Sequence, residues 1–161
     1  MLIRKASGTE MLELWKYPDV NTAPPTARYF YNKIETGNAV FWTVENEGEL
    51  IGELYVFYNL DDKDFADGKN TAYLCAFRIR EDFRGKGIGT GLLREVLARL
   101  KAAGFTRATI GVGPEEERNI KLYRNQGFVT KIKDCYFDPC AVDDNMLPKP
   151  DEGFWLLAKE L

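Results

Sequence analysis

The sequence of 161 residues contains no histidine. This absence excludes a Ser-His-Asp triad, a Cys-His pair and a histidine general base. It also restricts any zinc site to cysteine and carboxylate ligands, of which Cys135 and Cys140 would supply two. Nothing near this pair completes a set of four ligands, so we expect no metal site. A proton acceptor in this protein must be a carboxylate, a tyrosine or a chain of water molecules.

Cysteines and long apolar runs are also scarce. The three cysteines are an odd number without the spacing of a disulfide scaffold, which is typical of a reducing compartment. There is no run of about 20 apolar residues, and the apolar stretch at the start is too short for a signal peptide. The net charge is −3 and no basic stripe is present. We therefore expect a cytoplasmic protein with neither a membrane nor a nucleic acid as partner.

The pattern of apolar residues predicts a single domain, residues 1–161, built from alternating strands and helices. Strands are predicted at residues 2–5, 39–45, 49–58, 71–80, 106–112, 128–137 and 154–160. Helices are predicted at residues 8–17, 25–35, 87–103 and 115–126. Residues 61–69 form an expected acidic loop, and residues 138–152, with three prolines, are expected to be irregular.

The order of these elements predicts the type of sheet. Two strand–helix–strand passages in the second half favour parallel pairing, and the meander before them favours antiparallel pairing. We expect an α/β (α+β) fold with a mixed, mainly antiparallel central sheet of about seven strands and helices on both faces.

A glycine-rich turn, Arg84-Gly85-Lys86-Gly87-Ile88-Gly89, separates a predicted strand from the longest predicted helix. Glycine allows backbone N–H groups to approach a ligand closely because no Cβ intervenes. The helix start adds free N–H donors and about half a positive charge from the helix dipole. Together these features predict a phosphate-binding turn, although a tight turn that only needs conformational freedom would have the same composition.

Two common phosphate-binding motifs do not fit this turn. A dinucleotide fingerprint, G-x-G-x-x-G, would place its third glycine at Thr90 or Leu92. A P-loop, G-x-x-x-x-G-K-[ST], would require serine or threonine at the position of Gly87.

The stretch Ile79–Gly89, IREDFRGKGIG, resembles the acetyl-CoA-binding motif of the GNAT superfamily of N-acetyltransferases. The core of that motif, R/Q-x-x-G-x-G/A, is matched by Arg84, Gly87 and Gly89. A second stretch, Leu122–Phe128 (LYRNQGF), resembles the L-Y-x-x-x-G-F element of the same family. The resemblance implies a GNAT-like fold and an enzyme that transfers an acetyl group from acetyl-CoA to a primary amine by direct attack.

The resemblance also implies roles for individual residues. The backbone amides of the turn bind the cofactor pyrophosphate, and these belong to Arg84, Gly85, Lys86, Gly87, Ile88, Gly89 and Thr90. The main chain of the preceding strand, at Phe77, Arg78 and Ile79, hydrogen-bonds the pantetheine arm. Tyr123 protonates the departing thiolate. Many family members have an asparagine where this chain has Glu116; Asn119, three positions later, is the asparagine that we assign to the cofactor.

The attacking amine needs a proton acceptor. A primary amine has a pKa of about 10.4, so its deprotonation at pH 7 costs about 4–5 kcal/mol. Glu53 interrupts an otherwise apolar strand, and we predict that it is this base. Asp61, Asp62 and Asp64 in the acidic loop are predicted to recruit a cationic substrate instead.

Other functions remain open at the level of sequence. A non-catalytic acyl-CoA-binding sensor or interaction module on the same fold would share the turn, as would an O-acyl transferase or an enzyme for longer acyl groups. The acceptor is a small-molecule amine or a protein amine, and the acidic segments favour a cationic one. Homodimers are common in the family that the sequence resembles, but no residue here specifies an interface.

Overall fold

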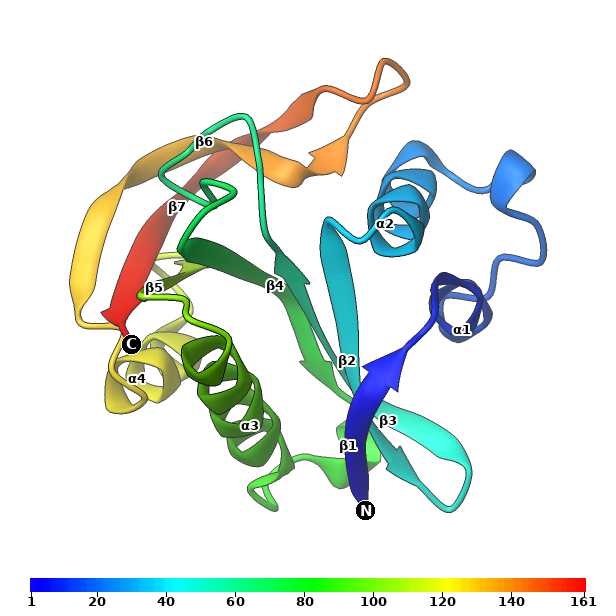
Figure 1. Ribbon diagram of the computed structural model, residues 1–161, viewed down its shortest axis with the longest axis horizontal. Coiled ribbons are helices and arrows are strands. Elements are labelled where there is room, and N and C mark those ends of the chain that lie inside the picture. The colour runs from blue at the N-terminus through cyan, green and yellow to red at the C-terminus, as the bar shows by residue number, and fades with distance from the viewer.

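All seven predicted strands lie in one sheet in the computed structural model, which describes residues 1–161 (Figure 1). They are β1 (Leu2–Ala6), β2 (Ala39–Asn46), β3 (Glu49–Phe57), β4 (Thr71–Ile79), β5 (Arg107–Val112), β6 (Thr130–Val142) and β7 (Pro148–Glu160). The strand order is β1-β2-β3-β4-β5-β7-β6, and only the β4–β5 pair is parallel. The predicted mixed, mainly antiparallel sheet is therefore confirmed.

Helices cover both faces of the sheet, as expected. They are α1 (Gly8–Leu14), α2 (Pro25–Glu35), α3 (Ile88–Ala102) and α4 (Glu117–Asn125), with two short 3-10 helices at Val20–Thr22 and Glu81–Phe83. Figure 1 shows α3 and α4 on one side of the sheet and α1 and α2 on the other. No helix is both long and apolar enough to span a membrane.

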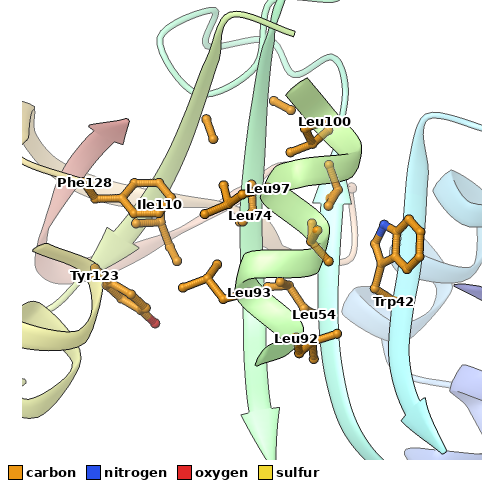
Figure 2. Packing of buried hydrophobic residues seen from close by; sticks show 14 of the residues in the cluster. Trp42, Leu54, Leu74, Leu92, Leu93, Leu97, Leu100, Ile110, Tyr123 and Phe128 are labelled. Atoms are coloured by element: carbon orange, nitrogen blue, oxygen red, sulfur yellow. The ribbon is translucent and has the colours of Figure 1, made fainter. Parts of the chain in front are cut away.

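The apolar stripe of α3 fixes this helix on the sheet. Leu92, Leu93, Val96, Leu97 and Leu100 are all buried, because residues four apart lie on the same side of a helix. Figure 2 shows the four leucines facing the sheet, next to Leu54, Leu74 and Ile110 of the central strands. Each buried leucine stabilises the fold by about 1.5–3 kcal/mol, so this stripe anchors the helix whose start forms the glycine-rich turn.

The prediction of an irregular segment at residues 138–152 was wrong. These residues form the outer part of a long β6–β7 hairpin, closed by a turn in which Asp143 accepts hydrogen bonds from the backbone of Asn145 and Leu147. Proline is tolerated in an edge strand and at bulges. Pro139 lies in β6, the last strand of the sheet, whose register shifts between Asp138 and Val142. Pro148 and Pro150 lie in the outer part of β7, which pairs with β6 alone because β5 pairs only with Trp155–Glu160.

The first helix is shorter than predicted. It ends at Leu14 rather than at residue 17 because Lys16 adopts a left-handed conformation with φ of 66°, which a helix cannot accommodate.

The parallel β4–β5 pair separates halfway along its length. Residues Thr71–Leu74 pair with Arg107–Ile110, and no pairing between these strands follows. At the same point the β3–β4 register shifts, and Ala76 adopts a left-handed conformation with φ of 50°. A bulge of this kind bends a strand. Because β4 bends away from β5 at this bulge, the centre of the sheet opens.

Candidate active site

The glycine-rich turn leaves a set of backbone donors unpaired. Gly85 and Gly87 have φ of 77° and 82°, in the left-handed region that favours glycine. Gly87 is the N-cap of α3, and no side chain caps the helix. None of the backbone N–H groups from Gly85 to Thr90 donates a hydrogen bond within the protein. These free donors at the positive end of a helix dipole can bind an anion such as phosphate.

A cavity of about 730 Å³ lies between this turn, the end of β4 and the start of α4. We call it the turn cavity. Its walls contain every residue predicted to bind the cofactor except Lys86, namely Phe77, Arg78, Ile79, Arg84, Gly85, Gly87, Ile88, Gly89, Thr90 and Asn119. The Lys86 ammonium lies instead over the ring of Phe83, 5.3 Å from its centroid. The structure thus brings the two halves of the predicted cofactor site together.

Gly89 allows the close approach of α3 to β4. A Cβ at this position would lie 3.2 Å from Ile79 Cγ1 and 3.3 Å from Phe77 Cζ. The third glycine of the motif therefore has a packing role, whereas a Cβ at Gly85 or Gly87 would meet no atom within 4 Å.

Side chains fix the polar groups of the turn cavity. The guanidinium of Arg84 donates to the carbonyl of Ile79 at 2.8 Å, which ties the turn to the end of β4. Across the cavity, Asn119 donates to the Glu116 carboxylate at 3.3 Å, and Glu116 also accepts from the backbone N–H of Gly113 at 2.5 Å. Glu116 therefore caps the loop between β5 and α4 and holds Asn119 in the wall.

A second cavity, of about 380 Å³, occupies the opening between β4 and β5. We call it the cleft cavity. Phe77 and Asn119 line both it and the turn cavity, so the two spaces adjoin. Tyr123 of α4 lines the cleft cavity, and its ring packs against Phe77 and Phe128 with centroid distances of 6.5 and 6.2 Å (Figure 2).

Burial governs the chemistry of Tyr123. Burial, and to a smaller extent the negative charge of Glu116, raises the pKa of the Tyr123 phenol above its usual range. The hydroxyl therefore keeps its proton at neutral pH, as a proton donor must.

A third cavity, of about 580 Å³, lies on the opposite face of the sheet, beneath α1 and α2. We call it the aromatic cavity because Trp15, Tyr17 and Phe30 line it. Glu53 is in its wall, and the side chain is 12% exposed.

The carboxylate of Glu53 is fully engaged. It accepts hydrogen bonds from Trp15 Nε1 at 2.9 Å and from the Tyr55 hydroxyl at 2.8 Å, and it pairs with Arg78 Nε at 3.2 Å. Glu53 does not line the cleft cavity, and Tyr123 does not line the aromatic cavity. The structure therefore does not bring the two predicted catalytic residues into one space.

Sequence reasoning missed the residues at which the two cavities meet. Cys75, Ala76 and Asp138 line both the cleft cavity and the aromatic cavity. Cys75 and Ala76 form the bulge in β4, and Asp138 comes from the hairpin strand that was expected to be irregular. No local signal indicates these positions, because they depend on strand register.

The acidic loop lies outside these cavities. Asp62 and Asp64 pair with Lys133 at 2.6 and 3.0 Å, and Asp61 and Asp62 line a separate hollow next to α2. The loop is therefore partly neutralised by a cation of β6.

Comparison with known proteins identifies a family and a fold. Residues 8–128 match the model of the acetyltransferase (GNAT) family. An uncharacterized N-acetyltransferase, YdgE, of Bacillus subtilis is 28% identical over 104 residues, which are 63% of each chain. The chain's matches span between 38% and 64% of the length of its curated relatives.

Two solved structures share the fold over nearly their whole length. The IAA acetyltransferase of Bacillus cereus has a TM-score of 0.68 at 18% identity and covers 99% of both chains. A GNAT family acetyltransferase of Elizabethkingia anophelis with acetyl-CoA bound has a TM-score of 0.65 at 19% identity, with 99% of this chain and 97% of that chain covered. The family match over residues 8–128, together with the turn and the opened β4–β5 pair, shows that this chain belongs to the GNAT acetyltransferase family.

Proposed function

We propose that the protein transfers the acetyl group of acetyl-CoA to a primary amine by direct attack on the thioester. The observation that supports this most strongly is the row of unpaired N–H groups from Gly85 to Thr90 at the start of α3. A pyrophosphate accepts several such donors at once. The Elizabethkingia anophelis relative of the same fold holds acetyl-CoA, which agrees with this cosubstrate.

The three cavities provide a path for the reactants. The pyrophosphate occupies the turn cavity, and the pantetheine arm follows β4 along Phe77, Arg78 and Ile79 into the cleft cavity. Of these three, the Ile79 carbonyl already accepts from Arg84, and Arg78 pairs with Glu53 of β3 in the sheet. The thioester then lies beside Tyr123, and the acceptor enters from the aromatic cavity on the other face.

The reaction forms a C–N bond and breaks a C–S bond. The amine nitrogen attacks the thioester carbonyl, and the sulfur leaves as a thiolate that accepts the proton of the Tyr123 hydroxyl. A coenzyme A thiol has a pKa close to that of cysteine, about 8.5, so the thiolate is a tolerable leaving group and the acid assists it. Glu53 stays a predicted base, although it would have to release one of its three donors to accept a proton.

Release of free coenzyme A across a panel of amines tests the proposal. We expect acetyl-CoA to raise the melting temperature and at least one primary amine to cause thiol release. If the protein binds acetyl-CoA but none of the amines in the panel causes thiol release, it is instead an acyl-CoA sensor. Absence of any stabilisation by millimolar acetyl-CoA would refute the cofactor site itself.

A further inference from the structure

We propose that Asp138 binds the amino group of the acceptor and accepts its proton, and that the acceptor carries an apolar body without a carboxylate. This inference rests on the proposed acetyl transfer to an amine. It assigns the proton acceptor to a strand that the sequence predicted to be irregular, and it names a class of substrate.

Asp138 is at the junction of the two reactant spaces. It lines both the cleft cavity, where the thioester is proposed to lie, and the aromatic cavity, from which the acceptor enters. The register of β6 shifts directly after Asp138, and Asp138 lines both cavities together with Cys75 and Ala76 of β4. A group at this junction contacts both the thioester space and the acceptor space.

One oxygen of Asp138 is available for a ligand. Its Oδ1 accepts hydrogen bonds from the backbone of Cys140 at 2.9 Å and Ala141 at 3.3 Å. These bonds fix the carboxylate, while Oδ2 has no hydrogen bond or ion pair within the protein. A fixed carboxylate with a free oxygen can accept a hydrogen bond from an ammonium group.

The charges around the aromatic cavity distinguish Asp138 from Glu53. Among the Asp, Glu, Lys and Arg side chains, this cavity contains Glu53, Arg78 and Asp138. Arg78 and Glu53 form an ion pair, and Glu53 accepts two further hydrogen bonds. Asp138 therefore has the one unpaired charge of the cavity, and it is negative.

The remaining walls determine which amines fit. Leu14, Trp15, Tyr17 and Phe30 present apolar and aromatic surface, and the Trp15 and Phe30 rings pack with centroids 5.1 Å apart. Such a surface takes a hydrocarbon or aryl group. A carboxylate on the acceptor would meet the charge of Asp138 without a free cation to pair with, because the guanidinium of Arg78 is already paired.

The ammonium of the bound acceptor gives one proton to Asp138 Oδ2, and the neutral nitrogen forms the C–N bond with the acetyl carbon. The C–S bond breaks, and the thiolate receives the proton of Tyr123. The nitrogen then loses its second proton to solvent, Asp138 releases the proton that it accepted to solvent, and the tyrosine regains one from solvent. The products are an amide, coenzyme A and one proton.

The variant Asp138→Asn tests this role, with Asp143→Asn as its control. Asparagine keeps an oxygen acceptor for the two backbone bonds but removes the negative charge. Asp143 makes the same kind of backbone bonds in the same hairpin and lines none of the three cavities. With 2-phenylethylamine as acceptor, we expect Asp138→Asn to lower kcat/KM about 100-fold or more, as is typical for loss of a general base. Acetyl-CoA should stabilise Asp138→Asn as strongly as it stabilises the wild-type protein, and Asp143→Asn should have wild-type activity.

A second comparison uses only the wild-type protein. 2-Phenylethylamine and L-phenylalanine share an amine and an aryl body, and only the latter has a carboxylate. We expect thiol release with the former to be much faster. Equal rates with the two amines would overturn the substrate class. Wild-type activity in Asp138→Asn would overturn the role of Asp138, and loss of activity in Glu53→Gln would then assign the base to Glu53. If acetyl-CoA binds but no amine is acetylated, the proposed acetyl transfer itself is refuted.

Discussion

Substitution of Gly87 separates the conformational role of the turn from its role in binding. Gly87 has φ of 82°, and a Cβ there would meet no atom within 4 Å. Gly87→Ala therefore causes strain without a clash, at a cost of about 1–2 kcal/mol for a left-handed L-residue. Gly91, four residues on, is inside α3 and equally free of neighbours. Gly91→Ala should instead stabilise the protein by about 1 kcal/mol, because alanine favours a helix.

These free energies predict opposite shifts in melting temperature. For a domain of this size, 1 kcal/mol corresponds to about 2–4 °C. Gly87→Ala should therefore melt about 2–8 °C lower than the wild-type protein, and Gly91→Ala about 2–4 °C higher. Differential scanning calorimetry without ligand measures both shifts.

Addition of acetyl-CoA then tests the binding role. At a concentration 100 times Kd, a ligand stabilises the folded state by about 2.7 kcal/mol, or about 5–10 °C here. The Gly91→Ala variant should show this full increment. Gly87→Glu should show none, because its carboxylate would lie among the N–H groups proposed to bind pyrophosphate and would repel that anion.

Two results would refute the reasoning about this turn. One is a Gly87→Glu variant that acetyl-CoA stabilises as strongly as it stabilises the wild-type protein. The other is a Gly87→Ala variant that melts higher than the wild-type protein, as expected only for a glycine with ordinary helical geometry.

Two further predictions concern tyrosines. Tyr123→Phe should lower kcat about 10- to 100-fold because the thiolate loses its proton donor, while the KM for the amine and the stabilisation by acetyl-CoA stay unchanged. The matched control is Tyr136→Phe, since Tyr136 is exposed and lines none of the three cavities. Equal rates in the two variants would argue against an acid role of Tyr123. Stability should fall as pH rises above about 10, the ordinary tyrosine pKa. Burial raises the pKa of Tyr55, Tyr73 and Tyr123, so the unfolded chain loses these protons first, and each tyrosine contributes up to about 1.4 kcal/mol per pH unit. Urea midpoints measured between pH 8 and 11 test this fall in the free energy of unfolding with pH. Tyr123→Phe should make the fall less steep, and Tyr136→Phe should not change it. A urea midpoint independent of pH would contradict the prediction.

The sequence predicts the elements of this fold well because their signals are local. The leucine stripe of α3 repeats every four residues, and glycine ends or begins several elements. The order of the elements then restricts the sheet to few topologies. The outer part of the β6–β7 hairpin was not predicted, because its prolines are typical of a loop when the neighbouring strands are not known. Pro139 is tolerated because β6 is at the edge of the sheet, and Pro148 and Pro150 because their part of β7 extends beyond its pairing with β5. Both positions are properties of the whole fold.

The proposed cofactor site and the proposed acceptor site also differ in whether their signals are local in the sequence. The donors proposed to bind pyrophosphate come from consecutive residues of one turn, so a short motif suffices to locate them. The aromatic cavity, which is proposed to hold the acceptor, is formed by α1, α2, β3, β4 and β6, and these elements are far apart in sequence. Its junction with the thioester space depends on two bulges, one at Ala76 and one after Asp138. A bulge changes which face a side chain occupies, so alternation along a strand cannot indicate such residues.

Glu53 shows the consequence of this limit. A charged residue in an apolar strand is a reasonable choice for a base, and the structure does place it in the wall of the aromatic cavity. The signal in the sequence identifies a buried carboxylate but not its partners. Trp15, from the end of α1, and Arg78, from the next strand, both bind it, and these contacts engage both of its carboxylate oxygens. Asp138 has a weaker signal in the sequence and a freer carboxylate in the structure, because hydrogen bonds within its own strand leave one oxygen open. Whether a carboxylate can accept a proton from a substrate therefore depends on the donors that surround it, and only the assembled sheet supplies these.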